Sequence, residues 1–250
     1  IEYEIDYLMI DTNCLLHPCV AHIVSKYKNN EIVNIKCRND IEEIIWNKIE
    51  EYINDLINRL KPKFLFIAID GVAPMGKIIQ QRQRRYKNSN VETNEMCPLQ
   101  SIELTPGSPY MERLDKKFNE YCKKLNIKYK YSSCFEESEG EHKILNYIKD
   151  EVKNNKNIVI YGLDADLLFL SLTDNLKNNL FVMREKQFFD KKEEDKNLMD
   201  NVEDIKYNYV NINEFHKIIN SYGISSNKFV LLCYLLGNDF YHHYCCLLYT

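Results

Sequence analysis

The chain has 250 residues, and its 33 Lys and Arg against 37 Asp and Glu give a net charge of −4. This balance excludes a protein that binds nucleic acid through bulk positive charge, although it leaves room for a local basic patch. Hydrophobic residues make up 45% and charged residues 28%, which is typical of a folded domain with a core and excludes disorder of the whole chain.

Short apolar runs of the kind found in buried parallel strands alternate with helical patterns. The strands are predicted at residues 7–10, 64–69, 127–131, 158–161 and 180–183. An apolar face with a 3.6-residue period predicts a helix up to residue 60 with Asp40 as its N-cap. Further helices are expected to open at Ser108-Pro109 and at residues 138–141, and a late one covers residues 229–236. This alternation predicts an α/β fold, a doubly wound, mainly parallel sheet flanked by helices.

Two stretches interrupt the alternation. Residues 86–106 are polar and only weakly periodic. Residues 186–204 contain a run of charges at positions 190–196, which predicts a solvated loop insertion.

Acidic residues stand where the predicted strands end or where the following helix begins. Seven carboxylates occupy such positions: Asp11, Asp70, Glu139, Glu141, Asp164, Asp166 and Asp239. The carboxyl ends of parallel strands share one edge of a sheet, so these side chains are expected to gather at one rim. Each alone also suits a turn or a helix cap, and Glu141 suits a capping box with Ser138.

Carboxylates gathered in one cleft repel one another unless cations or protons neutralise them. Mg²⁺ and Mn²⁺ prefer such hard oxygen ligands. Two such ions activate a water and stabilise the oxygens of a phosphodiester displacement. The sequence therefore predicts a two-metal site for phosphodiester hydrolysis.

A basic segment at residues 77–87 follows Asp70. On a helix, Lys77, Gln81, Arg84 and Arg85 share one face. Arg and Lys there suit a terminal phosphate of RNA, although a solvated basic helix has the same pattern.

The histidines are less specific. His17 lies near the predicted rim, where an imidazole can stack on a base, and His142 directly follows Glu141. For both, a purely structural role stays open. Adjacent His242 and His243 diverge on any regular element and are not taken as a metal pair.

Several motifs occur in the order found in the 5'→3' exoribonuclease (Xrn) family, and in combination they are similar to it across almost the whole chain. They are residues 70–74 (Asp-Gly-Val-Ala-Pro), 77–85, 105–107 (Thr-Pro-Gly), 139–144 (Glu-Gly-Glu-His-Lys-Ile), 161–167 and 236–240 (Leu-Gly-Asn-Asp-Phe). The resemblance implies a PIN-like core related to flap nucleases. It also implies one nuclease domain over residues 1–250, incomplete at both ends.

The resemblance further implies removal of nucleotides from single-stranded RNA with a 5'-monophosphate, with nucleoside 5'-monophosphates as products. By motif, the seven acids would bind the metal ions, Lys77, Gln81, Arg84 and Arg85 would hold the 5'-phosphate, and His17 would stack near the first base. A flap-specific DNA nuclease and a catalytically inactive RNA-binding module are the alternatives. Protein partners are not indicated.

Nine cysteines without Cys-x-x-Cys spacing indicate reduced thiols rather than disulfides or zinc. No apolar run approaches the ~18 residues that a membrane span needs, and the N-terminus shows no signal-peptide pattern. An intracellular protein is expected, with cytoplasm and nucleus both open.

Overall fold

The computed structural model describes residues 3–32, 35, 37–89, 99, 103–162, 165–173, 177–186 and 201–236, with the backbone alone at 84, 85 and 87–89. The strands are β1 (Tyr7–Asp11), β2 (Phe64–Ala68), β3 (Lys128–Ser132), β4 (Asn157–Tyr161), β5 (Asn179–Glu185) and β6 (Tyr207–Asn211). The helices are α1 (Asn13–Lys28), α2 (Arg38–Leu60), α3 (Met75–Ser89), α4 (Pro109–Lys124), α5 (Gly140–Glu151), α6 (Ala165–Thr173), α8 (Ile212–Ser221), α9 (Ser226–Tyr234) and the 3-10 turn η2 (Val202–Asp204).

The strands form one sheet in the order β3-β2-β1-β4-β5-β6. All described pairings are parallel except that of β5 with β6. The chain order reverses between β1 and β4, the place where doubly wound sheets bind their ligands. The predicted α/β fold is therefore confirmed.

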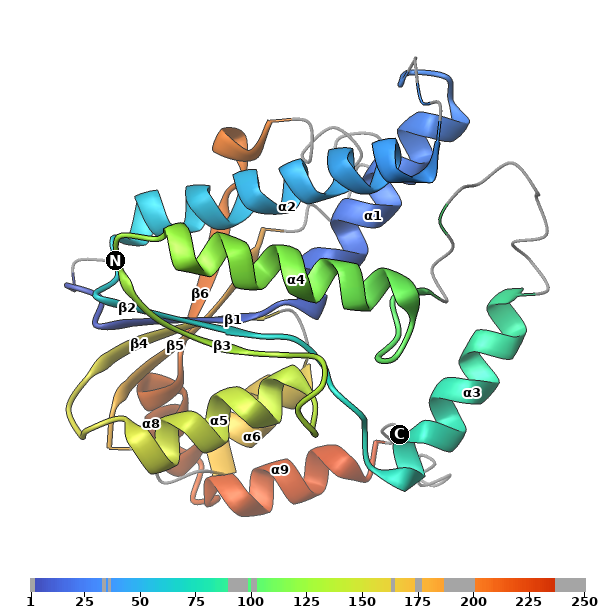
Figure 1. Cartoon of the computed structure of the whole chain (residues 1–250). Coiled ribbons are helices and arrows are strands. Elements are labelled where there is room, and N and C mark those ends of the chain that lie inside the picture. The colour runs from blue at the N-terminus through green and yellow to red at the C-terminus, as the bar shows by residue number, and fades with distance from the viewer. Residues whose placement is uncertain are drawn as a thin grey trace.

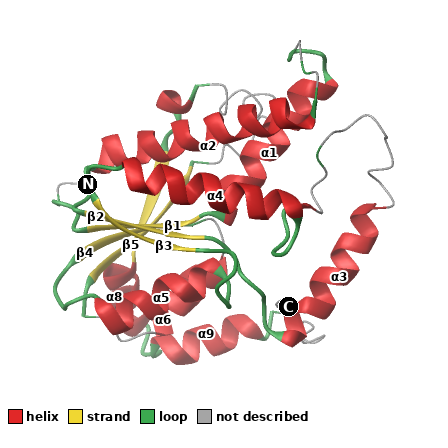
Figure 2. Cartoon of the chain, in the orientation of Figure 1, coloured by secondary structure: helices red, strands yellow, loops and turns green. Residues whose placement is uncertain are grey.

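Helices cover both faces of the sheet, as Figures 1 and 2 show. Side chains alternate along each strand, so Leu8 and Ile10 pack in the core under α1, α2 and α4. Met9 between them packs in the second core, against α5 and α6, where α8 and α9 also contribute. Helix α3 stands apart from both layers, beyond the edge where the parallel strands end (Figure 1).

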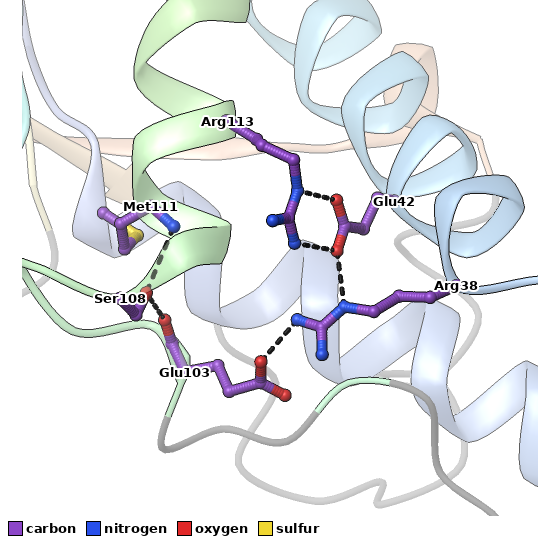
Figure 3. Close-up of polar contacts among 6 residues, drawn as sticks. All are labelled: Arg38, Glu42, Glu103, Ser108, Met111 and Arg113. Atoms are coloured by element: carbon purple, nitrogen blue, oxygen red, sulfur yellow. Dashed lines mark hydrogen bonds and ion pairs between the residues drawn. The ribbon is translucent and has the colours of Figure 1, made fainter.

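A buried carboxylate joins α2 to α4 (Figure 3). Glu42 is 6% exposed and accepts hydrogen bonds from Arg113 at 2.7 and 2.8 Å and from Arg38 at 2.7 Å. Arg38 also pairs with Glu103, just before α4. Two guanidinium groups therefore neutralise one buried charge between the helices.

Helix starts differ in part from the prediction. Ser108 caps α4 as expected, its hydroxyl accepting from the Met111 amide at 3.1 Å. Asp40 is not the N-cap of α2, because the helix begins earlier, at Arg38, with Cys37 as its N-cap. The Asp40 carboxylate accepts from the Cys37 amide at 3.0 Å. Ser138 does not cap α5 either; Glu139 is the N-cap, and Ser138 has a left-handed φ of 85°.

The sequence analysis did not predict α1, β6, α8 or the 3-10 turn η2. The Tyr-Asn-Tyr-Val-Asn sequence of β6 lacks a continuous apolar run, and the strand pairs only at the edge of the sheet. Most of the predicted charged loop at 186–204 lies outside the described residues, although η2 forms near its end and buries Val202. Within the described part of the chain, no helix has both the length and the apolar character that crossing a membrane requires.

Candidate metal and nucleic-acid site

Asp11 and Asp70 lie at the carboxyl ends of the neighbouring strands β1 and β2. Asp11, the last residue of β1, is 6% exposed. Its two oxygens accept hydrogen bonds from the Asn13 amide at 3.2 Å and from the Cys14 thiol at 3.5 Å. The side-chain amide of Asn13 donates to the Asp70 carboxylate. The first residues of α1 therefore hold both acids.

The start of α5 lies directly against these two carboxylates. The Gly140 amide donates to Asp70 Oδ1 at 2.6 Å. A Cβ atom at Gly140 would lie only 2.7 Å from Asp11 Oδ1, so this position needs glycine for the close approach. The Gly71 amide donates to the Ser138 carbonyl at 2.9 Å, which brings the residues after β2 beside those before α5.

Glu139 and Glu141 bring two more buried carboxylates, each 6% exposed, to this place. Lys77 of α3 forms an ion pair with Glu139, its Nζ atom 2.9 and 3.0 Å from the two oxygens. His142 Nδ1 lies 3.7 Å from Glu141 Oε1. Glu139, Glu141 and His142 each offer a ligand atom within 4.8 Å of the others.

Electrostatic effects connect the acids further. Burial raises the pKa of Asp70 to about 6, and the charge of Glu139 adds to the increase, while the Gly140 amide, Lys77 and Lys143 oppose it. Burial also raises the pKa of Tyr234 in α9, and the charges of Asp166 and Glu141 raise it further. Asp166 lies in the first turn of α6, the helix that follows β4, and β4 is the parallel neighbour of β1. Asp166 therefore stands at the same edge of the sheet as Asp11.

The donor set suits a hard divalent cation. It consists of the buried carboxylates of Asp11, Glu139 and Glu141 and the half-buried carboxylate of Asp70, together with the imidazole of His142. Burial, together with the charge of Glu139, already raises the pKa of Asp70. A cation of charge +2 would relieve this repulsion and let Asp70 ionise fully at neutral pH. The residues present therefore fit a bound metal ion.

The family model described as "XRN 5'-3' exonuclease N-terminus" matches residues 1–186. The chain belongs to the XRN 5'-3' exonuclease family. The names of similar proteins agree with this family assignment. The chain is 29% identical to 5'-3' exoribonuclease 1 of Saccharomyces cerevisiae over 95% of its length, and 28% identical to the Homo sapiens protein of that name over 96%. It is 32% identical to 5'-3' exoribonuclease 2 of Schizosaccharomyces pombe over 74%. It spans 17%, 16% and 21% of these proteins, respectively.

The XRN fold brings four of the seven predicted acids into one neighbourhood, Asp11, Asp70, Glu139 and Glu141. Asp166 lies in the first turn of α6, at the same edge of the sheet. Asp164 and Asp239 lie outside the described residues. His142, for which the sequence left a structural role open, lies beside Glu141.

The predicted phosphate-binding residues belong to α3. Lys77 reaches the acids, and Gln81 is half-buried one turn further on. Arg84 and Arg85 lie further along the same helix, where the structure describes their backbone alone. His17 is exposed on α1, one turn after Asn13 and on the same helix face.

Sequence reasoning missed two residues that hold the site together. The sequence analysis assigned no role to Asn13, whose side-chain amide donates to Asp70. Its place two residues after Asp11, at the carboxyl end of β1, is the signal that could have indicated such a contact. Lys143 was noted only within a motif; its ammonium is buried beside the acids. A buried lysine cannot be read from one sequence, because nothing in the local pattern shows where its side chain ends.

Proposed function

We propose that this chain forms the metal-binding nuclease region of a 5'→3' exoribonuclease that acts on single-stranded RNA with a 5'-monophosphate and releases nucleoside 5'-monophosphates. The supporting observation is the convergence of Asp11, Asp70, Glu139 and Glu141 at one edge of the sheet, with Lys77 of the basic helix α3 in contact with them. The names of the relatives agree with this activity.

The acids would hold Mg²⁺ or Mn²⁺, and we expect two ions. Asp11, Asp70, Glu139, Glu141 and Asp166 are the ligand candidates in the described part of the chain, and Asp164 and Asp239 complete the proposed set. Bound metal would supply a water of lowered pKa and positive charge for the oxygens of the scissile phosphate. Asn13 and Gly140 orient the carboxylates through their hydrogen bonds.

The RNA end would be recognised by the basic face of α3 and by α1. Lys77 and Gln81 lie one turn apart on α3, and Arg84 and Arg85 follow at the next turn. Their donors match the oxygens of a 5'-monophosphate. His17 on α1 would stack on the first base.

Degradation of matched substrates tests this function. The purified chain receives a 5'-monophosphate RNA, the same RNA with a 5'-hydroxyl end, and a flap DNA, each with Mg²⁺, with Mn²⁺ or with EDTA. We expect cleavage of the phosphorylated RNA in metal, nucleoside 5'-monophosphates as products, and no cleavage in EDTA. An Asp70→Asn variant should abolish turnover and still bind RNA.

Three other results would contradict the proposal, each in a different way. Equal cleavage in EDTA would remove the metal-dependent mechanism. Faster cleavage of flap DNA would favour a structure-specific DNA nuclease. Binding of RNA without any turnover in either metal would favour an RNA-binding module.

A further inference from the structure

Lys143 is a buried lysine beside the acidic rim. It lies in α5, one turn after Glu139, and only 8% of the residue is exposed. Its ammonium donates to the carbonyl oxygen of Ile69 at 2.7 Å and to that of Ser133 at 2.8 Å. Lysine is almost never buried without partners, so these bonds compensate for the loss of water around the charge.

The two carbonyls belong to the exits of two strands. Ile69 directly precedes Asp70, and Ser133 directly follows β3. The Ile69 amide itself donates to the Ser132 carbonyl at 3.0 Å, a typical hydrogen-bond distance. One side chain of α5 therefore joins the ends of β2 and β3 to the helix that carries Glu139 and Glu141.

This connection acts at the point where Asp70 meets α5. The Asp70 carboxylate accepts from the Gly140 amide, in the first turn of the same helix. Lys143 donates to the backbone carbonyl of Ile69, one residue before Asp70, and the Gly140 amide donates to the Asp70 side chain. Both the backbone and the carboxylate of Asp70 are thus tied to α5.

We propose that Lys143 is a positioning residue for the metal site: its ammonium fixes the position of Asp70 relative to Glu139 and Glu141. This inference rests on the proposed function, since it takes those carboxylates as metal ligands. Burial lowers the pKa of Lys143, while Glu136 and Asp70 oppose that effect.

The charge and the hydrogen bonds of Lys143 have opposite effects on metal binding. A buried positive charge near the carboxylates repels a divalent cation, so removal of the charge alone should tighten metal binding. Loss of the two carbonyl contacts frees the backbone at Ile69 from α5 and leaves Asp70 held to that helix through the Gly140 amide, so metal binding should weaken. The sign of the change therefore separates a positioning role from a merely electrostatic one.

Binding of Mn²⁺, followed by electron paramagnetic resonance of the free ion, measures this sign without any need for turnover. Lys143→Met keeps the length of the side chain and removes its charge and donors. We expect about tenfold weaker Mn²⁺ binding, the size found when partners that orient metal ligands are removed. Lys149→Met, at an exposed position of the same helix, is the matched control and should bind as the unchanged chain does. Lys143→Arg retains charge and donors and should recover part of the affinity.

Two outcomes are distinguished. Failure of the unchanged chain to bind Mn²⁺ would contradict the proposed function itself. Normal binding by the unchanged chain with equal or tighter binding by Lys143→Met would overturn the positioning role alone.

Hydrogen exchange gives a second readout that keeps the inference testable if the variant is less stable. In Lys143→Met the Gly140 amide should exchange at least tenfold faster, because its acceptor Asp70 is no longer held in place. Amides in the centre of the sheet, such as Val159, should change less. Equal acceleration at Gly140 and Val159 would indicate a general loss of stability and would overturn the inference.

Discussion

The ammonium of Lys77 lies 2.9 and 3.0 Å from the two carboxylate oxygens of Glu139, so a side chain of α3 neutralises one of the proposed metal ligands. Only 13% of the Lys77 side chain and 8% of the Glu139 side chain are exposed, so solvent screens this pair weakly. A metal ion at Glu139 would compete with the ammonium. A Lys77 released from Glu139 would then be available to a phosphate.

Lys77→Met should therefore separate metal binding from phosphate recognition. We expect the variant to bind Mn²⁺ several-fold more tightly, because the metal ion no longer has to compete with the Lys77 ammonium for Glu139. The preference for a 5'-phosphate over a 5'-hydroxyl RNA should fall at the same time. Arg82→Met removes a charge from an exposed position of the same helix and is the control for both measurements. Weaker Mn²⁺ binding by Lys77→Met would contradict the competition.

Gly140→Ala tests the close approach of α5 to the acids. The new Cβ would lie 2.7 Å from Asp11 Oδ1 and 3.2 Å from Asp70 Oδ1, so the carboxylates must move apart. Titration with Mn²⁺ should show binding weakened at least tenfold. Asn146→Ala, at an exposed position of α5, controls for a change of residue in this helix and should leave binding unaltered. Unchanged affinity in Gly140→Ala would show that the site tolerates wider spacing.

The raised pKa of Asp70 predicts a pH-dependent stability. The folded protein holds the Asp70 proton more tightly than the unfolded chain does, so the ionised carboxylate destabilises the fold. This destabilisation is fully present above pH 6 and is lost as the pH falls towards 3.8. In EDTA, Asp70→Asn should raise the free energy of unfolding by about 1–3 kcal/mol at pH 8 and have almost no effect near pH 4. Denaturant unfolding at both pH values measures the difference.

Asp6→Asn is a control of opposite sign. Burial raises the pKa of Asp6, but the Asn157 amide and Lys63 outweigh burial and hold that pKa below its usual range. The variant should therefore lose stability at pH 8. Destabilisation of Asp70→Asn at pH 8 in EDTA would show that its hydrogen bonds outweigh the cost of its charge.

Glu42 should matter far more to stability than the neighbouring Glu43. Burial raises the pKa of Glu42, but hydrogen bonds from Arg113 and Arg38 outweigh it and lower that pKa, so the stability contributed by the carboxylate is present at neutral pH and lost in acid. Glu42→Gln should cost about 1–3 kcal/mol of unfolding free energy at pH 7. Glu43 forms an exposed ion pair with Lys117, so Glu43→Gln should lower the free energy of unfolding by less than about 1 kcal/mol. Equal losses in thermal unfolding would contradict a special role for the α2–α4 contact shown in Figure 3.

Strands β1, β2, β4 and β5 were predictable because they are largely buried on both faces and so carry continuous apolar runs, whereas the edge strand β3 is mostly exposed. Ile158 to Tyr161, for example, is almost fully buried in the structure. The start of α4 was predictable as well, since Ser108 followed by Pro109 is a local signal. The start of α2 was not, because the Asp40 carboxylate bonds back to the Cys37 amide, and an acid suits the third position of a helix as well as its cap.

By itself, the sequence determined which acids stand at strand ends and which basic residues share one face of a helix, because both follow from periods of two and 3.6 residues along the backbone. Only the tertiary structure decided that Lys77 pairs with Glu139, that Asn13 binds Asp70, and that Lys143 reaches Ile69 and Ser133. These contacts join segments far apart in the chain. Their geometry depends on how strands and helices pack, which no local pattern records.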